Sequence, residues 1–368
     1  MAGSTFGNIF RITTWGESHG KGVGVVVDGC PAGLPLEESD IQKYLDRRKP
    51  GQSRYTTPRK EEDTVEILSG VFEGKTTGTP ISLAVYNKTQ RSGDYSAIAD
   101  CYRPGHADLT YDMKYGFRDY RGGGRSSGRE TIGRVAAGAI ACKILEEFGI
   151  KLLTYTKSIG SVEVSPARFD AGQIPQNPFY MPDAQAAQEA VSYVEKCMSA
   201  QDSTGGMIEC VVTGMKPGVG DPAFEKLSAN LAKAICSIGA VKGFEIGDGM
   251  AVAKANGSQN NDPYEMSPEG EVIKLTNHSG GILGGISDGS PIIFRAAIKP
   301  TPSISREQST VTRDGRSIHV QVKGRHDPII VPRAVVVVES MAALTLLDMM
   351  FASIHSNMEN LVRFFKNC

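Results

Sequence analysis

The stretch from Ser127 to Gly149 reads SGRETIGRVAAGAIACKILEEFG and gives the clearest helix prediction in the chain. Apolar side chains recur at helical spacing between Ile132 and Ile140, and Gly149 lies beyond the end of the pattern. Ser127 and Glu130 match the S-x-x-E capping box found at helix starts. We therefore predict a helix that begins just after Ser127 and buries one face.

Short strands are predicted on both sides of this helix. Apolar and β-branched runs bounded by Gly, Pro, Asn and Asp predict strands at 23–27, 65–68, 81–86, 207–212, 292–298 and 318–322. Further helices are predicted near 183–198, near 339–365 and around Ile41 and Leu45. Strands and helices do not alternate regularly and no Pro/Ser-rich linker divides the chain, so we expect one compact α+β domain over residues 1–368.

Two further segments give specific expectations. A helix starting at Asp221 and Pro222 would carry one apolar stripe, made of Phe224, Leu227, Leu231, Ala234 and Ile235. The longest apolar run, 334–354, contains Glu339 and Asp348, which would be costly in hydrocarbon. We therefore expect a strand followed by a buried helix there, and no membrane span.

Composition is that of a globular protein without a global charge bias. The 368 residues are 40% hydrophobic and 22% charged, with a net charge of −1, so charge offers no reason to expect nucleic acid or a membrane as partner. The N-terminus lacks the pattern of a secretory signal. The seven cysteines are scattered without a C-x-x-C pair, which indicates reduced thiols, a cytoplasmic location and no metal site.

The segment 118–134, RDYRGGGRSSGRETIGR, carries the richest local signal. It contains five arginines among glycines and serines, namely Arg118, Arg121, Arg125, Arg129 and Arg134. This segment can be interpreted as a solvated loop or as an RGG-like RNA-binding tract. Because the segment leads into a helix start, whose free amides favour anions, we prefer a site for a phosphorylated or carboxylated small molecule. A second basic cluster at 46–54 supports a polyanionic ligand.

Other short motifs argue against nucleotide-binding folds. The loop 69–80, SGVFEGKTTGTP, is one residue too short for a phosphate-binding P-loop and is interpreted as a turn between strands. Gly20, Gly22 and Gly24 precede a strand, which does not support a dinucleotide fold. His19 and His106 lie in polar turns where an imidazole can transfer protons, with Glu17 and Asp108 near in sequence to orient the rings.

Four segments together resemble the signature segments of the chorismate synthase family. They are GESHG at 16–20, RPGHAD at 103–108, GGRSSGRET at 123–131 and GRHDP at 324–328. Further similar segments lie between or after them, DRRKPGQSRYTTPR, AVKGFEIGDG, NHSGGILGGISDG and KPTPS, so the resemblance covers nearly the whole chain.

The resemblance implies a fold and a reaction. The fold would be a single-domain β-α-β sandwich, with helices packed between antiparallel sheets, in a homotetramer. The reaction would be the 1,4-anti elimination of phosphate from 5-enolpyruvylshikimate 3-phosphate, by a carbon–oxygen lyase that requires reduced FMN and completes the shikimate pathway leading to aromatic amino acids. An external flavin reductase would supply electrons. The alternative within the family, a bifunctional enzyme that reduces its flavin with NADPH, is less favoured because the associated insertions are not evident.

The resemblance also implies roles for individual residues. The substrate would be held by Arg48, Arg54, Arg129 and Arg325. The flavin would be held by Arg125, Ser126, Ser127, Gly239, Ala240, Gly284, Lys299, Pro300, Thr301, Pro302, Ser303 and Arg325.

Catalytic roles follow in the same way. His19 would protonate the departing phosphate, and His106 would stabilise or protonate the reduced flavin. Asp327 would assist removal of the C6 hydrogen, while Ser18 and Ser127 would relay protons or orient water.

Overall fold

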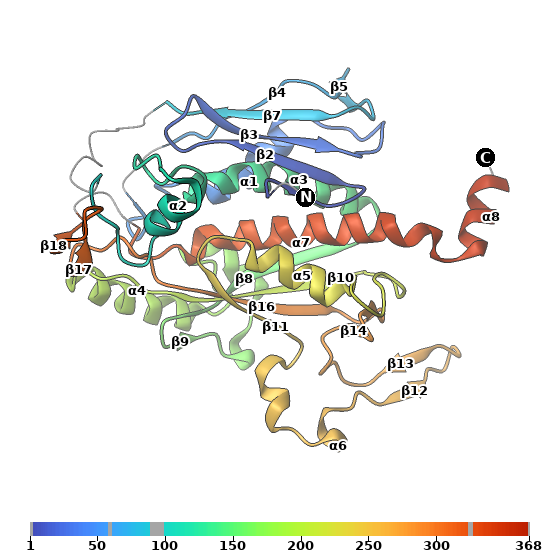
Figure 1. The fold of residues 1–368 in the computed structure, drawn as a ribbon. Helices are drawn as coiled ribbons and strands as arrows, with labels where there is room; N and C mark the ends of the chain where they lie inside the picture. The colour runs from blue at the N-terminus through green and yellow to red at the C-terminus, as the bar shows by residue number, and fades with distance from the viewer. Residues whose placement is uncertain (1–2, 58–60, 89–98, 323–326, 367–368) are drawn as a thin grey trace.

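Two antiparallel five-stranded sheets enclose a layer of helices in the computed structural model, which describes residues 3–57, 61–88, 99–322 and 327–366 (Figure 1). The first sheet has the order β1 (Thr5–Phe6), β2 (Arg11–Gly16), β3 (Gly22–Asp28), β7 (Ile81–Tyr86), β4 (Val65–Ile67). The second has the order β11 (Val241–Ile246), β16 (Ile292–Ile298), β10 (Gly206–Thr213), β8 (Lys151–Ile159), β9 (Val162–Glu163). The expected α+β fold, a β-α-β sandwich with helices packed between antiparallel sheets, is confirmed.

Each sheet turns an apolar face toward the helices. In β3, Val23, Val25 and Val27 are buried, and in β10 the side chains of Ile208 and Cys210 are fully buried. Alternate residues of a strand point to opposite faces, so period-two burial selects the inner face. Four helices lie between the sheets: α1 (Glu38–Arg48), α3 (Thr131–Glu147), α5 (Leu227–Cys236) and α7 (Val331–Ser353).

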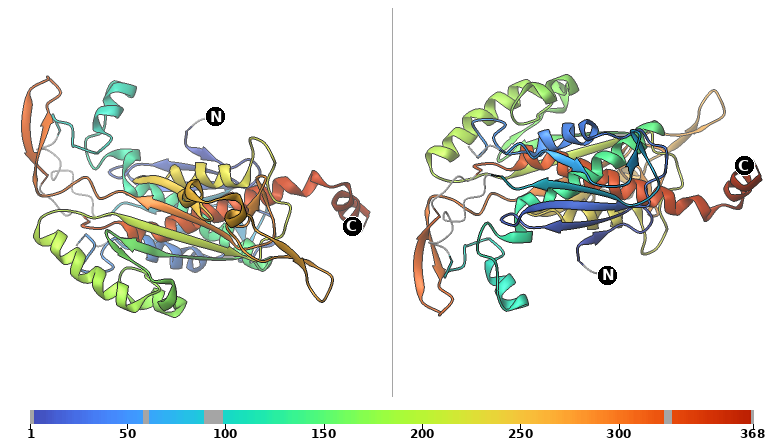
Figure 2. Two further views of the ribbon diagram at one scale, coloured as in Figure 1. Left: turned by 90° about the horizontal axis from the view of Figure 1, so that it is seen from below. Right: turned by 90° about the horizontal axis from the view of Figure 1, so that it is seen from above.

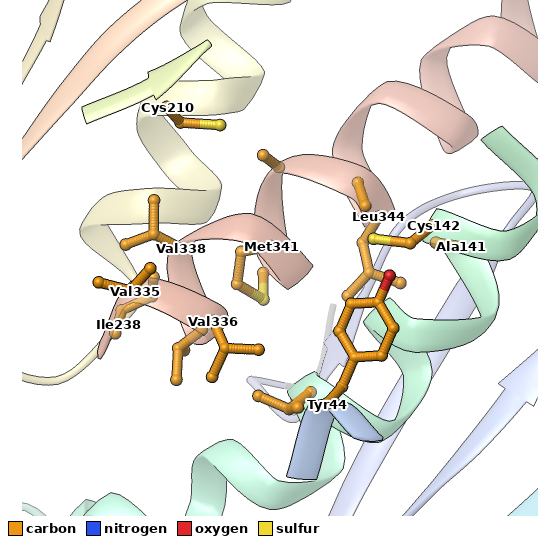
Figure 3. Close-up of a cluster of buried hydrophobic side chains, with 14 of the residues drawn as sticks. Tyr44, Ala141, Cys142, Cys210, Ile238, Val335, Val336, Val338, Met341 and Leu344 are labelled. Carbon is orange, nitrogen blue, oxygen red and sulfur yellow. The ribbon is translucent and has the colours of Figure 1, made fainter. Parts of the chain in front are cut away.

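Helices α3 and α7 form the centre of the core. Figure 3 shows Val338 and Met341 of α7 lying between Cys142 of α3 on one side and Cys210 of β10 on the other. A Cβ added at Gly138 of α3 would lie 2.6 Å from the Cα of Ser340. The two helix backbones therefore approach closely only because this position lacks a side chain.

The apolar run is one continuous α-helix up to Ser353, so the strand expected at its start is wrong. Its β-branched valines resemble a strand pattern, but burial on all sides favours a helix that is apolar all round. Glu339 accepts two hydrogen bonds of 2.8 Å from Arg47. By length and composition the helical stretch Val331–Ser356 would suffice to cross a membrane, but 83% of its most apolar window is buried inside the protein. It is the core helix of the sandwich.

Two predicted helix starts are also wrong in detail. The helix expected from Asp221 begins at Leu227, and Phe224 lies outside it with 95% of its surface exposed. The Ser127–Glu130 capping box is not formed. The Ser127 hydroxyl accepts from the backbone N–H of Arg129 at 3.3 Å, in a short 3-10 turn before α3. The Glu130 carboxylate instead accepts from Thr14 and Arg134, because these tertiary donors compete with the local one.

The remaining elements lie around the sandwich (Figure 2). They are the helices α2 (Asp108–Tyr115), α4 (Ala184–Ser199), α6 (Gly257–Asn260) and α8 (Met358–Lys366), and the hairpins β5–β6 (Val71–Phe72, Lys75–Thr76), β12–β13 (Tyr264–Met266, Val272–Lys274), β14–β15 (Ile282–Leu283, Ile286–Ser287) and β17–β18 (Glu307–Val311, Ser317–Gln321). The β5–β6 hairpin confirms a turn between strands at 69–80. The helix expected at 339–365 is interrupted at Ile354–Ser356 by a 3-10 turn.

Candidate active site

A glycine loop, Gly122 to Gly124, brings the two candidate histidines against one short segment. A Cβ added at Gly122 would lie 2.5 Å from Cδ2 of His19, and one at Gly123 would lie 2.8 Å from Cε1 of His106. All three glycines have positive φ, between 53° and 83°. The loop thus needs glycine both for its backbone conformation and for contact with the imidazoles. Histidines 87 positions apart in the chain share one site.

His106 belongs to a tightly bonded turn that precedes α2. Arg103 donates through Nε and NH2 to the Asp108 carboxylate at 2.8 and 2.7 Å, and its NH2 lies 3.0 Å from Nδ1 of His106. Burial raises the pKa of Asp108, but the hydrogen bonds of Arg103 outweigh burial and hold that pKa far below its ordinary value. Oδ1 of Asp108 lies 3.4 Å from Nδ1 of His106, so Asp108 is near this ring, as expected. The Glu17 carboxyl carbon instead lies 4.0 Å from the Cβ position of Gly124.

The serines and Arg125 that follow the glycine loop are positioned by local contacts. The Ser126 hydroxyl donates to the Gly123 carbonyl at 2.7 Å. Arg125 reaches back to β2, where NH2 donates to the Thr14 hydroxyl at 2.6 Å. The loop is thereby fastened to β2, the strand that Ser18 and His19 follow in the chain.

Arg48 and Arg129 share one buried carboxylate. Arg48 NH1 donates to Asp63 at 2.7 Å and Arg129 NH1 donates to its other oxygen at 3.0 Å. All three guanidinium nitrogens of Arg48 donate within the protein, the others to Thr131 and to the Gly128 carbonyl. Burial lowers the pKa of Arg48 to about 9 although Asp63 opposes the shift, which leaves it charged at neutral pH.

Four of the ten buried side-chain atoms that lack a hydrogen-bond partner among the described residues belong to candidate site residues. Within the part of the chain that the structure describes, Nε and NH2 of Arg129, Oγ of Ser18 and Oγ1 of Thr301 are buried and make no hydrogen bond. An unsatisfied buried donor costs about 1–3 kcal/mol, and more when it is charged. Because such a cost is normally offset by a partner, these atoms indicate an anionic or polar ligand.

The run Lys299 to Ser303 lies beside the His106 turn. Lys299 Nζ donates to the Gly105 carbonyl at 2.8 Å, and a Cβ at Gly105 would lie 3.1 Å from Cβ of Pro302. Burial, with nearby Lys242, lowers the pKa of Lys299. Its backbone N–H donates to the carbonyl of Ala240, a non-glycine residue with a φ of 73°. The candidate flavin residues at 125–127, 239–240 and 299–303 thus form one connected set with His106.

Two further candidate residues, Gly284 and Arg54, lie among other contacts. Gly284 lies in the β14–β15 turn. The neighbouring residue, Gly285, accepts a hydrogen bond through its carbonyl from the backbone N–H of Leu227, at the start of α5. Ala240, in contrast, follows the end of α5. Ten helical residues separate these ends by about 15 Å. Arg54 pairs with Glu195 and is 71% exposed at its side chain. Arg325 lies outside the described residues.

The Asp327 carboxylate is held by hydrogen-bond donors that the sequence motifs do not identify. Its carboxylate accepts from the backbone N–H of Thr57 at 2.9 Å and from Arg333 at 2.8 Å. Arg333 also donates to the carbonyl of Arg48. Neither Arg333 nor Asp63 stands in a motif. Only the fold reveals that Asp63 links the two basic segments and that Arg333 links Asp327 to Arg48. Arg103 was visible in RPGHAD, but no role was assigned to it.

A helix-filled sandwich with a histidine-lined, arginine-rich site at one end defines the class: an α+β enzyme for a small molecule. The sequence profile described as chorismate synthase matches residues 10–351. Chorismate synthases of Lachnospira eligens and Methanococcoides burtonii are 67% and 53% identical, covering 100% and 99% of this chain and 100% of each relative. A crystal structure of a chorismate synthase superimposes with a TM-score of 0.76 at 32% identity, covering 98% of both chains.

The chain belongs to the chorismate synthase family. This membership assigns it to the lyases of the shikimate pathway and gives it a small-molecule substrate.

Proposed function

We propose that this chain eliminates phosphate from 5-enolpyruvylshikimate 3-phosphate in the 1,4-anti sense to give chorismate, with reduced FMN as cofactor. The observation that carries the proposal is the unpaired, buried guanidinium edge of Arg129 in the segment whose glycines contact both His19 and His106. A substrate with two carboxylates and a phosphate needs such charge-assisted donors, because burying its charges unpaired would be prohibitive.

Substrate binding is assigned to Arg129, Arg48, Arg54 and Arg325. Arg129 has two guanidinium nitrogens to offer, while Arg48 acts by holding Asp63, which positions Arg129 in turn. His19 would hold the proton that the departing phosphate accepts. Ser18, with its unpaired buried hydroxyl 3.0 Å from the Cβ position of Gly122, would orient water or relay that proton.

The residues around His106 fit a flavin site. Ser126, Ser127, Ala240, the run 299–303 and the unpaired Oγ1 of Thr301 would hold FMN, with Arg125, Gly239, Gly284 and Arg325 completing the set. Reduced FMN, when bound, would lend an electron to the substrate and recover it, without net redox change. Asp327, fixed by Arg333 and Thr57, would assist removal of the C6 hydrogen.

Anaerobic turnover with dithionite-reduced FMN tests the reaction and the electron source together. Chorismate should form there and should not form aerobically with NADPH, because we propose a monofunctional cytoplasmic enzyme served by an external flavin reductase. Chorismate under aerobic NADPH would show intrinsic reductase activity instead, and no chorismate in either case would reject the function.

We also propose that residues 1–368 form one domain and that four copies assemble. A native mass measurement should give four times the chain mass of 39.4 kDa. A monomer at micromolar concentration would contradict the tetramer.

A further inference from the structure

The turn around His106 presents two competing partners to one ring nitrogen. Nδ1 of His106 lies 3.0 Å from NH2 of Arg103 and 3.4 Å from Oδ1 of Asp108. A guanidinium can only donate, so contact with Arg103 requires a lone pair on Nδ1. A carboxylate can only accept, so contact with Asp108 requires a proton there. The two contacts demand opposite tautomers of a neutral ring.

Distance favours Arg103. A separation of 3.0 Å lies within the ordinary range of N–H hydrogen bonds, whereas 3.4 Å lies beyond it. Oδ2 of Asp108 accepts from the backbone N–H and Nε of Arg103 at 3.0 and 2.8 Å, and Oδ1, the oxygen that faces His106, accepts from NH2 of Arg103 at 2.7 Å. NH2 carries two hydrogens, one for Asp108 and one for His106, so a single arginine satisfies both groups.

The surroundings leave this arrangement little freedom. The side chains of Arg103 and Asp108 are 6% and 5% exposed, and that of His106 is 16% exposed. Among the described residues, the other charged groups with contacts to this turn are Arg118, with Nε 3.9 Å from Oδ1 of Asp108, and Lys299, whose Nζ donates to the Gly105 carbonyl. Both are cationic and therefore offer no acceptor for a proton on Nδ1.

We infer that Arg103 is a positioning residue that holds neutral His106 with its proton on Nε2. Nδ1 faces Arg103 within the turn, whereas Nε2 lies 3.4 Å from the Cβ position of Gly123 in the glycine loop. If the proposed function holds, this tautomer makes His106 a hydrogen-bond donor to the flavin and not an imidazolium that gives up a proton. Arg103 thus selects between the two roles left open for this histidine.

The tautomer can be read directly by nitrogen NMR of the full-length protein labelled with [15N]histidine. Spectra are recorded without flavin at about pH 8, above the ordinary imidazole pKa. A ring nitrogen without a proton resonates far downfield of one that carries it. His106 signals are identified by their loss in His106→Gln. In the wild type, Nδ1 should be unprotonated and Nε2 protonated.

Arg103→Met removes the donor and leaves Asp108 as the nearest partner, so the proton should move to Nδ1. Arg103→Lys keeps a cationic donor and should retain the wild-type pattern. The His19 signals serve as an internal control and should not change in either variant. Protonated Nδ1 in the wild type, or a proton still on Nε2 in Arg103→Met, would overturn the inference. If Arg103→Met does not fold, the wild-type spectrum still decides.

Failure of this inference is distinguishable from failure of the proposed function. The ring signals require neither flavin nor turnover, whereas the function is decided by chorismate formation under anaerobic conditions.

Discussion

At the scale of single residues, the two histidines on the glycine loop differ in their neighbours. Asp119 is paired with Arg121, and the charge of nearby His19 adds to that pairing in lowering the pKa of Asp119, whereas Nδ1 of His106 lies 3.0 Å from NH2 of Arg103. Two histidines in one site can therefore act in different steps of the reaction, because the neighbouring residues determine which group each ring proton contacts.

Replacement of either histidine by alanine should lower turnover on the order of 10²- to 10⁴-fold, but through different steps. His19→Ala should slow C–O cleavage, because the phosphate leaves without a proton, and should leave the spectrum of bound reduced flavin unchanged. His106→Ala should instead shift the pH at which that spectrum changes from neutral to anionic. Anaerobic stopped-flow absorbance across about pH 6 to 8 measures both. Identical flavin titrations for wild type and His106→Ala would contradict the assignment.

Arg129→Lys should raise KM on the order of tenfold while the fold survives. Lysine keeps the charge but loses the planar fork whose Nε and NH2 are unpaired in the site. Steady-state kinetics under anaerobic conditions and a thermal melt measure the two effects. Arg11→Lys, at a side chain 50% exposed and paired with Asp28, is the matched control and should change neither. An unchanged KM in Arg129→Lys would remove this arginine from the substrate site.

At the scale of elements, helix packing and helix capping can be tested separately. Gly138→Ala improves helix propensity by about 1 kcal/mol but places a methyl group 2.6 Å from the Cα of Ser340. We expect the overlap to win and the free energy of unfolding to fall by about 1–3 kcal/mol in urea titrations. Gly257→Ala, where a Cβ meets nothing within 4 Å, is the control and should stay within about 0.5 kcal/mol. If Gly138→Ala stabilised the protein, helices α3 and α7 would have to move apart at little cost in free energy.

The cap of α4 should make stability depend on pH. Asp183 accepts from the backbone N–H of Gln185, Ala186 and Ser165 and from Arg168. Burial raises its pKa, but these donors outweigh burial and lower the pKa to about 2. Because the folded pKa lies below the unfolded one of about 3.9, the ionised cap stabilises the fold above that value by about 2 kcal/mol. This contribution is lost as pH falls toward 2.

Asp183→Asn is the variant that isolates this effect. Its deficit in unfolding free energy relative to the wild type should be full at about pH 6 and should shrink between about pH 4 and pH 2. Denaturant titrations of both proteins at matched pH and concentration give the difference. A deficit that does not change with pH would mean that the charge of Asp183 contributes nothing.

At the scale of the whole molecule, the two ends of the chain are joined by one side chain. Asp348 of α7 accepts from the backbone N–H of Asn8, Ile9 and Phe10 at 2.9, 2.7 and 3.0 Å. The N-terminal strands of the first sheet are thus fastened to the core helix near the C-terminus (Figure 1).

Asp348→Asn keeps the shape but removes the charge and puts a donor opposite other donors. We expect a loss of about 1.5–3 kcal/mol in unfolding free energy and faster hydrogen exchange at residues 8–10. Asp314→Asn, in the exposed β17–β18 turn, is the control and should be nearly neutral. Unchanged exchange at residues 8–10 would show that sheet pairing alone holds this end.

The sequence by itself determined the elements whose signal is local and the motifs that identify the family. Strands at 81–86 and 292–298 match β7 and β16, because alternating burial and flanking turn residues act within a few positions. Arg103, His106 and Arg129 were visible in motifs. The family match follows from order and spacing along the chain, which needs no coordinates.

Only the tertiary structure decided what depends on contacts between distant segments. The valines of α7 resemble a strand until burial between two sheets is known, and Glu130 leaves its capping role because Thr14 and Arg134 lie beside it. Asp63 and Arg333 acquire importance because the fold brings Arg48, Arg129 and Asp327 to them. Such choices are made by burial and by competing hydrogen-bond partners, and neither can be read from neighbouring positions in the chain.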